Sequence, residues 1–432
     1  MTASTPNFQL PTSKGSGSKQ LGAHRGYVPG RVDFHPAGTN DSPWELGVGS
    51  WKLFAALCLA ASLLATSGAA QESVDALASR AAAAREAGNL KDALALYRKG
   101  VEARPDWDEG HWYVATLLYE MDQYADAREA FVDVLRRQPT HAGALGLKGL
   151  CEFELRRYDR ALADLLEAGN LGVSRSPGIA TVVRYHAAIL LTRFGDFEVG
   201  NQMLTEFAAE GADTPQVIEA FGINVLRLPM LPSELPADAR ERVGLAGRAG
   251  YAMAARQMEA ARTALNELIT RYPAIAHAHY SRGVFLLTED ADRALDDFRR
   301  ELEISPSHVP ARLQIAFEYI KRGEPAKARR PAEEAAQLAP EHFATRLALG
   351  QVLLDLNEVD KALVELEKAS ALAPRSPQTH FMLARAYARA GRAADAERER
   401  AEFTRLDQMV RALRTGLPAV GGIPGAGPRI ER

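Results

Sequence analysis

The chain has 432 residues, and its 47% hydrophobic and 25% charged residues are the proportions of an ordinary globular protein, which excludes a largely disordered chain or one that crosses a membrane many times. Its 52 basic and 55 acidic side chains leave a net charge of -3, so no strong positive field attracts nucleic acid and we expect no nucleic-acid partner. Two cysteines, Cys58 and Cys151, are too few for a disulfide framework or a cysteine-rich zinc site.

Both ends of the chain have the composition of disordered segments. Residues 1–50 contain 8 Gly, 5 Pro and 6 Ser without sustained periodicity, so they cannot bury enough apolar area to become ordered. Residues 416–432 hold five Gly and three Pro. We therefore predict a disordered N-terminal extension and a disordered C-terminal tail.

Residues 51–70 have the three parts of a secretory signal peptide. Lys52 provides the positive charge, residues 53–65 form an uncharged apolar core, and small residues follow the core. The core is short for a membrane-spanning helix, which needs about 20 apolar residues. We expect cleavage after Ala69 or Ala70 and export of the mature protein to the periplasm or cell envelope.

The position of this signal, fifty residues into the chain, leaves three interpretations open. Translation that starts near Val48 would make it an ordinary cleaved signal peptide. An uncleaved signal would anchor the protein in the inner membrane, and only residues 51–70 would then contact the membrane. The third interpretation is a buried helix of the soluble fold.

A repeat with a period near 34 residues fills most of the remaining chain. Six prolines fall at spacings of 34, 134, 33, 34 and 34 residues, and an alanine stands twelve residues before each of them. The residue four positions after the alanine is usually large and apolar and lies on the same helix face, and the proline ends the helix. The prolines are Pro105, Pro139, Pro273, Pro306, Pro340 and Pro374, and the alanines are Ala93, Ala127, Ala261, Ala294, Ala328 and Ala362.

A second amphipathic helix is predicted before each of these helices, as in the pattern Leu349, Gly350 and Leu353. Residue types that accept a left-handed conformation, such as Gly88 and Asn357, separate the two helices. Each unit is therefore a helix, a turn and a helix. Glycines of the first helices are expected to face alanines of the second, which lets the two backbones approach closely. The expected pairs are Gly149 with Ala161, Gly283 with Ala294 and Gly350 with Ala362.

This pattern resembles the tetratricopeptide repeat family, in which apolar, Leu-Gly, Tyr, Ala, Phe and Pro positions recur over 34 residues. The resemblance covers roughly residues 74–407 and implies an all-α, right-handed solenoid of about nine tandem helix-turn-helix units. The chain is similar to exported bacterial envelope proteins of this family. Units are expected to begin near Val74, Asp108, Ala142, Thr181, Arg242, Ala276, Val309, Phe343 and Pro377.

The array divides into three stretches by how closely it follows the pattern. Residues 71–180 are predicted to form N-terminal units, residues 181–241 degenerate repeats with a Pro-rich connection, and residues 242–415 C-terminal units with a capping helix. Prolines within residues 228–236 exclude a helix there, and the helix before them, about residues 215–228, is expected to lack a partner. The connection is either an extended segment held by its leucines or a hinge or partner-binding segment.

Patterns typical of active sites do not occur in the sequence. We find no glycine-rich phosphate loop, no nucleophile turn and no paired metal-ligand spacing. His277 and His279 are two residues apart, about 200° around a helix axis, so they cannot share a metal ion. Cys151 lies in an apolar stretch without a basic neighbour, which indicates an inert thiol. We therefore expect no catalytic residue, no cofactor and no metal, and a protein that is not an enzyme.

The resemblance implies a concave groove that is lined by the first helices of successive units. At the groove positions of the family this sequence has aromatic and arginine residues, the types enriched at binding hot spots. We expect a non-catalytic scaffold or assembly factor that binds a protein or peptide there. Two alternatives remain, namely that single aromatic residues pack between neighbouring helices, or that the groove serves a polysaccharide-binding, small-molecule-binding or weakly catalytic envelope protein. The predicted partner-binding residues are Trp112, Tyr119, Phe153, Tyr280, Phe317, Phe381, Arg385 and Arg389.

Overall fold

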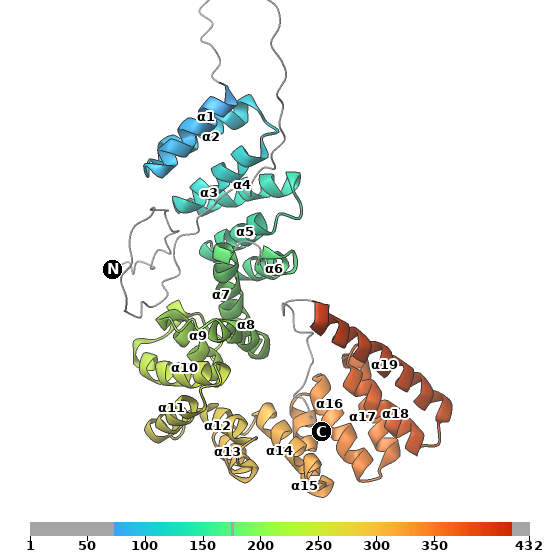
Figure 1. The fold of residues 1–432 in the computed structure, drawn as a ribbon. Coiled ribbons are helices and arrows are strands. Elements are labelled where there is room, and N and C mark those ends of the chain that lie inside the picture. Colours follow the sequence, from blue (N-terminus) through green and yellow to red (C-terminus); the bar gives the residue numbers. More distant parts are fainter. Residues whose placement is uncertain (1–72, 174–176, 417–432) are drawn as a thin grey trace, which may run out of the picture. The chain divides into compact units, whose positions relative to one another are not determined.

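The computed structural model describes residues 73–173 and 177–416, and all the regular secondary structure in these ranges is helical (Figure 1). The predicted extension 1–50, the signal 51–70 and the tail after Gly416 lie outside the described residues. None of the helices in the described part of the chain combines the length and the apolar character needed to span a membrane.

The described chain divides into two compact units, and the boundary between Val183 and Arg184 falls within α7 (Pro177–Arg193). The first unit contains six further helices. They are α1 (Val74–Glu86), α2 (Leu90–Ala103), α3 (Asp108–Glu120), α4 (Tyr124–Arg137), α5 (Ala142–Glu154) and α6 (Tyr158–Asn170).

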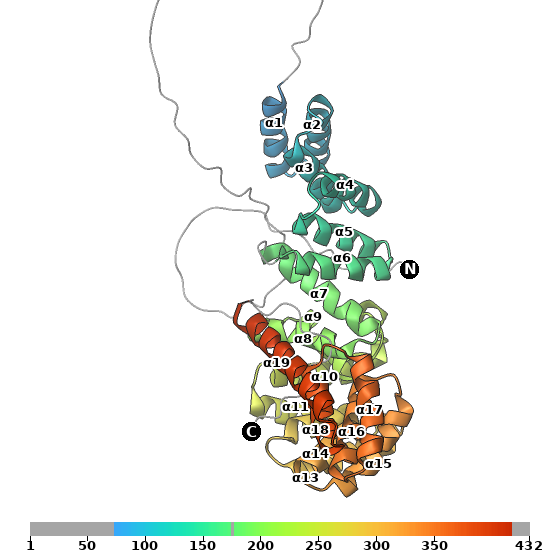
Figure 2. The ribbon, with the colours of Figure 1, turned by 90° about the vertical axis from the view of Figure 1, so that its right-hand side faces the viewer.

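The second unit contains the remaining helices of the described chain. They are α8 (Phe197–Ala209), α9 (Pro215–Val225), α10 (Arg240–Ala254), α11 (Met258–Arg271), α12 (Ala278–Leu286), α13 (Ala291–Ile304), α14 (Val309–Lys321), α15 (Pro325–Leu338), α16 (Phe343–Asp355), α17 (Val359–Leu372), α18 (Pro377–Arg389) and α19 (Ala393–Gly416). Consecutive helices pack on one another, as Figure 2 shows for α16 to α19.

The predicted repeat register and the all-α solenoid of about nine helical pairs are confirmed. Six of the nine expected units begin at the first residue of a helix, and the alanines that stand twelve residues before the prolines are fully buried. The large residue one turn after the alanine is also buried, as at Tyr97, Phe131 and Phe298. The six helices are those that start at Val74, Asp108, Ala142, Val309, Phe343 and Pro377.

The glycines of the first helices were expected to face an alanine of the second helix, but they face the residue one helical turn after it. A Cβ atom added to Gly283 would lie 2.5 Å from the ring of Phe298, and one added to Gly350 would lie 2.6 Å from Leu366. At Gly149 the corresponding neighbour is Leu165, at 3.0 Å. Each neighbour is four residues after the expected alanine. The glycines therefore make room for the large core residue of the second helix, and the alanine is not their nearest neighbour.

The prediction that the helix before the Pro-rich connection lacks a partner was wrong. That helix, α9, packs closely along α10, and the connection between them contains two short 3-10 turns, Pro232–Glu234 and Ala237–Ala239. Leu231 and Leu235 of this connection are buried, which confirms the interpretation of a segment held by its leucines. The expectation that residues 228–236 contain no helix was wrong for the first of these 3-10 turns, Pro232–Glu234.

Positive φ angles occur at twelve described residues, and eleven of these lie two residues after the end of a helix. This is the position at which a left-handed residue ends a helix and satisfies its last carbonyl groups. Gly88 and Asn357 are among them, as the sequence predicts. The twelfth, His277, has a φ of 72° and precedes the first residue of α12.

Candidate functional site

A cavity of about 360 Å³ lies in the second unit between residues of α8, α9, α10 and α12. Most of its walls are apolar, with several polar side chains among them. A volume of this order accommodates a small ligand or the side chains of a bound peptide. The lining residues are Phe197, Glu198, Asn201, Thr205, Asn224, Val225, Arg227, Gly250, Met253, Ala254, Tyr280, Ser281 and Val284.

A buried amide fixes the arrangement of α8 and α9 around the cavity. The side-chain nitrogen of Asn224 donates to Thr192 Oγ1 at 3.0 Å and to the carbonyl oxygen of Phe197 at 2.9 Å. Asp196 caps the start of α8, because its carboxylate accepts from the backbone N–H of Val199 at 3.3 Å. These bonds hold the first turn of α8 against α9, so the walls of the cavity are positioned before any partner binds.

The two charged side chains that line the cavity pair with each other. Arg227 donates to Glu198 at 2.5 Å, and its guanidinium group lies over the ring of Phe197 at 4.9 Å from the ring centre. Arg227 itself adopts a positive φ of 50° at the end of α9. The cavity therefore carries little net charge of its own, and its remaining polar groups are uncharged.

Tyr280 is the predicted partner-binding residue that lines this cavity. Its ring lies 4.8 Å from the ring of His308 and 5.8 Å from that of Phe298. Burial raises the pKa of the Tyr280 hydroxyl, so the group stays protonated at neutral pH and can donate a hydrogen bond. The neighbouring Ser281 hydroxyl donates to the carbonyl oxygen of His277 at 2.9 Å.

The predicted binding residues of the first unit contact aromatic residues of neighbouring helices. The Trp112 ring lies 4.8 Å from that of His141. Tyr119 and Phe153 pack against the first residue of the following helix, Tyr124 at 5.7 Å and Tyr158 at 5.5 Å. These contacts agree with the alternative that such residues pack between helices, and their role in binding stays a prediction.

The other predicted residues of the second unit lie on α14 and α18. Phe317 packs against a buried cluster with Leu313 and Ala348, whereas Phe381 is 45% exposed. Arg385 pairs with Asp355 at 3.5 Å, and Arg389 donates to the carbonyl oxygen of Leu354. Both arginines thus join α18 to α16, and none of these four residues lines the cavity.

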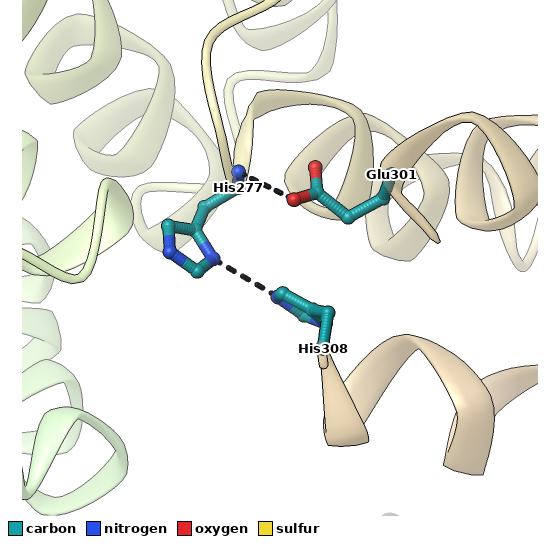
Figure 3. Close-up of side chains that lie close together, drawn as sticks. All are labelled: His277, Glu301 and His308. Atoms are coloured by element: carbon teal, nitrogen blue, oxygen red, sulfur yellow. Dashed lines mark hydrogen bonds between the residues drawn. The ribbon is translucent and has the colours of Figure 1, made fainter. Parts of the chain in front are cut away.

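Sequence reasoning missed a cluster of two histidines and a glutamate next to Tyr280. His308 Nε2 and His277 Nδ1 are 2.9 Å apart, and Glu301 accepts a hydrogen bond from the backbone N–H of His277 at 2.8 Å (Figure 3). Glu301 also accepts from the backbone N–H of Tyr280 at 3.2 Å. Burial lowers the pKa of His277 to about 4 and that of His308 to about 3, and the positive charge of Arg227 acts in the same direction. Both imidazoles are therefore neutral at pH 7.

His277 and His279 have different partners. His279 points to Asp297, at 2.9 Å, while His277 meets a histidine 31 residues further along the chain. That sequence separation is close to the repeat period. The spacing of about one repeat between the two histidines was therefore the signal by which the sequence could have indicated that they meet. Burial raises the pKa of the Cys151 thiol, in agreement with its interpretation as inert.

The tetratricopeptide repeat family model matches residues 115–170, 247–309, 313–377 and 347–402. A curated relative, the probable biofilm formation methyltransferase WspC of Pseudomonas putida, is 36% identical over 109 residues, which is 24% of this chain. The chain spans about a quarter (26%) of the length of that relative.

Solved structures of MamA align with about two fifths of this chain. MamA residues 41 to the end from Desulfovibrio magneticus RS-1 align with a TM-score of 0.36 and 19% identity, over 40% of this chain and 97% of that one. A double mutant of MamA from RS-1 gives 0.37 and 18%, over 41% and 98%. At these scores and identities the similarity adds nothing on function.

Proposed function

This chain belongs to the tetratricopeptide repeat family, and we propose that it is a non-catalytic scaffold that binds a protein or peptide in the cavity between α8, α9, α10 and α12. The repeats themselves indicate a role in protein interaction. The observation that supports the finer proposal is the cavity, because it combines apolar walls with uncharged hydrogen-bonding groups in a site that is held open by buried bonds.

The chemistry of the walls suits an apolar side chain of a peptide. Phe197, Val225, Met253 and Val284 supply apolar surface, and such surface at the centre of an interface contributes most of the binding energy. Asn201 is exposed at the cavity and can hydrogen-bond to a peptide backbone. A partner with an apolar anchor in an extended segment fits this combination.

A catalytic role has less support in this cavity. Acid-base catalysis needs a titratable group whose pKa is brought near neutral pH, often beside a second such group. Here Glu198 and Arg227 neutralise each other, and the raised pKa of Tyr280 moves its hydroxyl further from neutral pH. Binding without chemistry is therefore the function that we propose.

We expect Tyr280→Ala to weaken binding of a peptide about 30-fold, the equivalent of about 2 kcal/mol for one aromatic hot spot. Peptides selected from a random display library on the full chain serve as the probes, and their affinities are measured by fluorescence anisotropy. Phe381→Ala is the matched control, because it removes an exposed aromatic ring that lies outside the cavity. Equal losses in the two variants, or none in Tyr280→Ala, would refute the assignment.

We also propose that the mature protein is exported, supported by the signal-like sequence of residues 51–70. The native protein purified from its source is expected to begin directly after Ala69 or Ala70. Mass spectrometry of its N-terminal peptide measures this, and a native chain that retains residues 51–70 would contradict cleavage and favour the anchored alternative.

A further inference from the structure

Asn224 brings one unpaired hydrogen-bonding atom to the cavity between α8, α9, α10 and α12. The residue is 5% exposed and lines the cavity. Its side-chain nitrogen donates to two acceptors, Thr192 Oγ1 at 3.0 Å and the carbonyl oxygen of Phe197 at 2.9 Å. Within residues 73–173 and 177–416, no group donates a hydrogen bond to its side-chain oxygen.

The two partners of the Asn224 amide fix which of its ends faces the cavity. The Thr192 hydroxyl donates its proton to the carbonyl oxygen of Ala188 at 3.0 Å, so toward Asn224 it can only accept. The carbonyl oxygen of Phe197 is an acceptor as well. Exchange of the amide nitrogen and oxygen would therefore place acceptor against acceptor at both contacts. The oxygen is the end of the amide that is left for the cavity.

An unpaired acceptor at this position selects what binds in the cavity. Water can hydrate the oxygen while the cavity is empty, but an apolar anchor that displaces the water leaves the oxygen without a partner. Such a loss weakens binding, whereas an anchor with a donor of its own regains the bond. The hydroxyls of Thr205 and Ser281 at the cavity already donate to backbone carbonyl groups. The donor for Asn224 is therefore expected from the ligand.

The charges at the cavity favour an uncharged donor. Arg227 lines the same cavity, and its positive charge opposes the entry of a second cation. The carboxylate of Glu198, which could attract a lysine or arginine, is already paired with Arg227. A cationic anchor would thus be buried among apolar walls without a counter-charge, which costs free energy.

We propose that the peptide anchor is a tryptophan side chain whose indole N–H donates to Asn224 Oδ1, an inference that rests on the proposed function. Indole has one donor and no acceptor, so this single bond satisfies it. The cavity of about 360 Å³ has room for the ring, and Phe197 and Tyr280 offer aromatic contacts. The main chain of an extended peptide stays outside while its side chain enters, so a main-chain N–H does not reach the buried amide.

The decisive probe is a peptide in which 3-benzothienylalanine replaces tryptophan, because sulfur takes the place of the N–H and the shape of the ring is kept. Peptides are selected from a random display library on the full chain, and their affinities are measured by fluorescence anisotropy. We expect the selected peptides to share a tryptophan. Its replacement by 3-benzothienylalanine is expected to weaken binding about 10-fold, because the Asn224 oxygen loses its donor.

Asn224→Leu tests whether this preference comes from Asn224, and the two anchors are expected to bind the variant equally well. Asn201→Leu is the matched control, because it changes an asparagine of the same cavity that is exposed to solvent. It is expected to change both affinities alike and to keep the preference of about 10-fold for tryptophan. Should Asn224→Leu fail to fold, as circular dichroism would show, the two anchors on the wild type decide the question.

Equal affinities of the two anchors for the wild type, or selected peptides whose anchor is leucine, phenylalanine or tyrosine, would overturn the tryptophan assignment. Peptide binding in the cavity would then still be supported if Tyr280→Ala weakens it. A preference for tryptophan that persists in a folded Asn224→Leu chain would show that another group accepts the N–H. If Tyr280→Ala binds the selected peptides as the wild type does, both the proposed function and this inference fail.

Discussion

Gly247→Ala is expected to lower the free energy of unfolding of the second unit by about 3 kcal/mol. A Cβ atom at Gly247 would lie 2.0 Å from the carbonyl oxygen of Ile218, and one at Gly222 would lie 2.0 Å from that of Val243. Both obstacles are backbone atoms, so no side-chain rotation relieves the overlap. The helices α9 and α10 must separate, and the packing between them is lost along their whole contact.

Gly244→Ala tests whether the effect comes from this contact. Gly244 lies in the same helix one turn away, and the nearest atom to an added Cβ is the end of the Arg248 side chain at 4.0 Å. Because alanine forms helices better than glycine, this change is expected to stabilise the protein by about 0.5 to 1 kcal/mol. Urea unfolding of both variants measures the difference. Similar effects at Gly244 and Gly247 would contradict the pairing of α9 with α10.

Asp297→Asn is expected to cost about 3 kcal/mol at neutral pH, because it breaks a buried charge network. Asp297 is 5% exposed and accepts from His279 Nδ1 at 2.9 Å and from Arg282 at 2.7 and 2.8 Å. Burial by itself would raise the pKa of Asp297, but the hydrogen bonds from His279 and Arg282 outweigh burial and lower it. The exposed Asp296 pairs only with Arg299 in the same helix, so Asp296→Asn is expected to change stability by less than about 0.5 kcal/mol.

The effect of Asp297 also has a defined pH dependence. Its pKa in the folded state is lower than the value near 3.8 of a free carboxyl group, so its ionisation stabilises the fold above that value. The stabilisation is lost as the pH falls through the folded-state pKa. The stability difference between the wild type and Asp297→Asn is therefore expected to shrink as the pH falls below about 4. A difference that grows with acid would contradict the ionised state of Asp297.

The sequence was sufficient for the repeat architecture because its signal is local. Each alanine and proline acts within one helix, and the period repeats this signal many times, so helix starts such as Val309 and Phe343 were placed correctly. The sequence also predicted that the two helices of a unit approach closely at the glycines of the first helix, although the neighbour of Gly283 is Phe298 and not Ala294. That error arises because spacing along a helix gives the face of a residue but not the height at which two helices cross.

The contact between α9 and α10 and the cluster around His277 depend on packing that no local pattern reports. Prolines between α9 and α10 interrupt the repeat, so the close approach at Gly222 and Gly247 has no periodic counterpart in the sequence. Of the eight predicted binding residues, Tyr280 alone lines the cavity. The cavity itself forms where α9, which lies outside the repeat pattern, joins the regular units. The binding positions of the family are defined in regular units, so they do not include residues such as Asn224 and Arg227.

The most direct test of the proposed binding site is a photo-crosslinking map. A peptide selected on the full chain is synthesised with a photoreactive group at its apolar anchor and irradiated with the protein, and the attached residues are identified by mass spectrometry. We predict adducts on cavity residues of α8, α10 and α12, such as Met253 and Val284. Adducts confined to the exposed face of α18 around Phe381, or to the first unit, would contradict binding in this cavity.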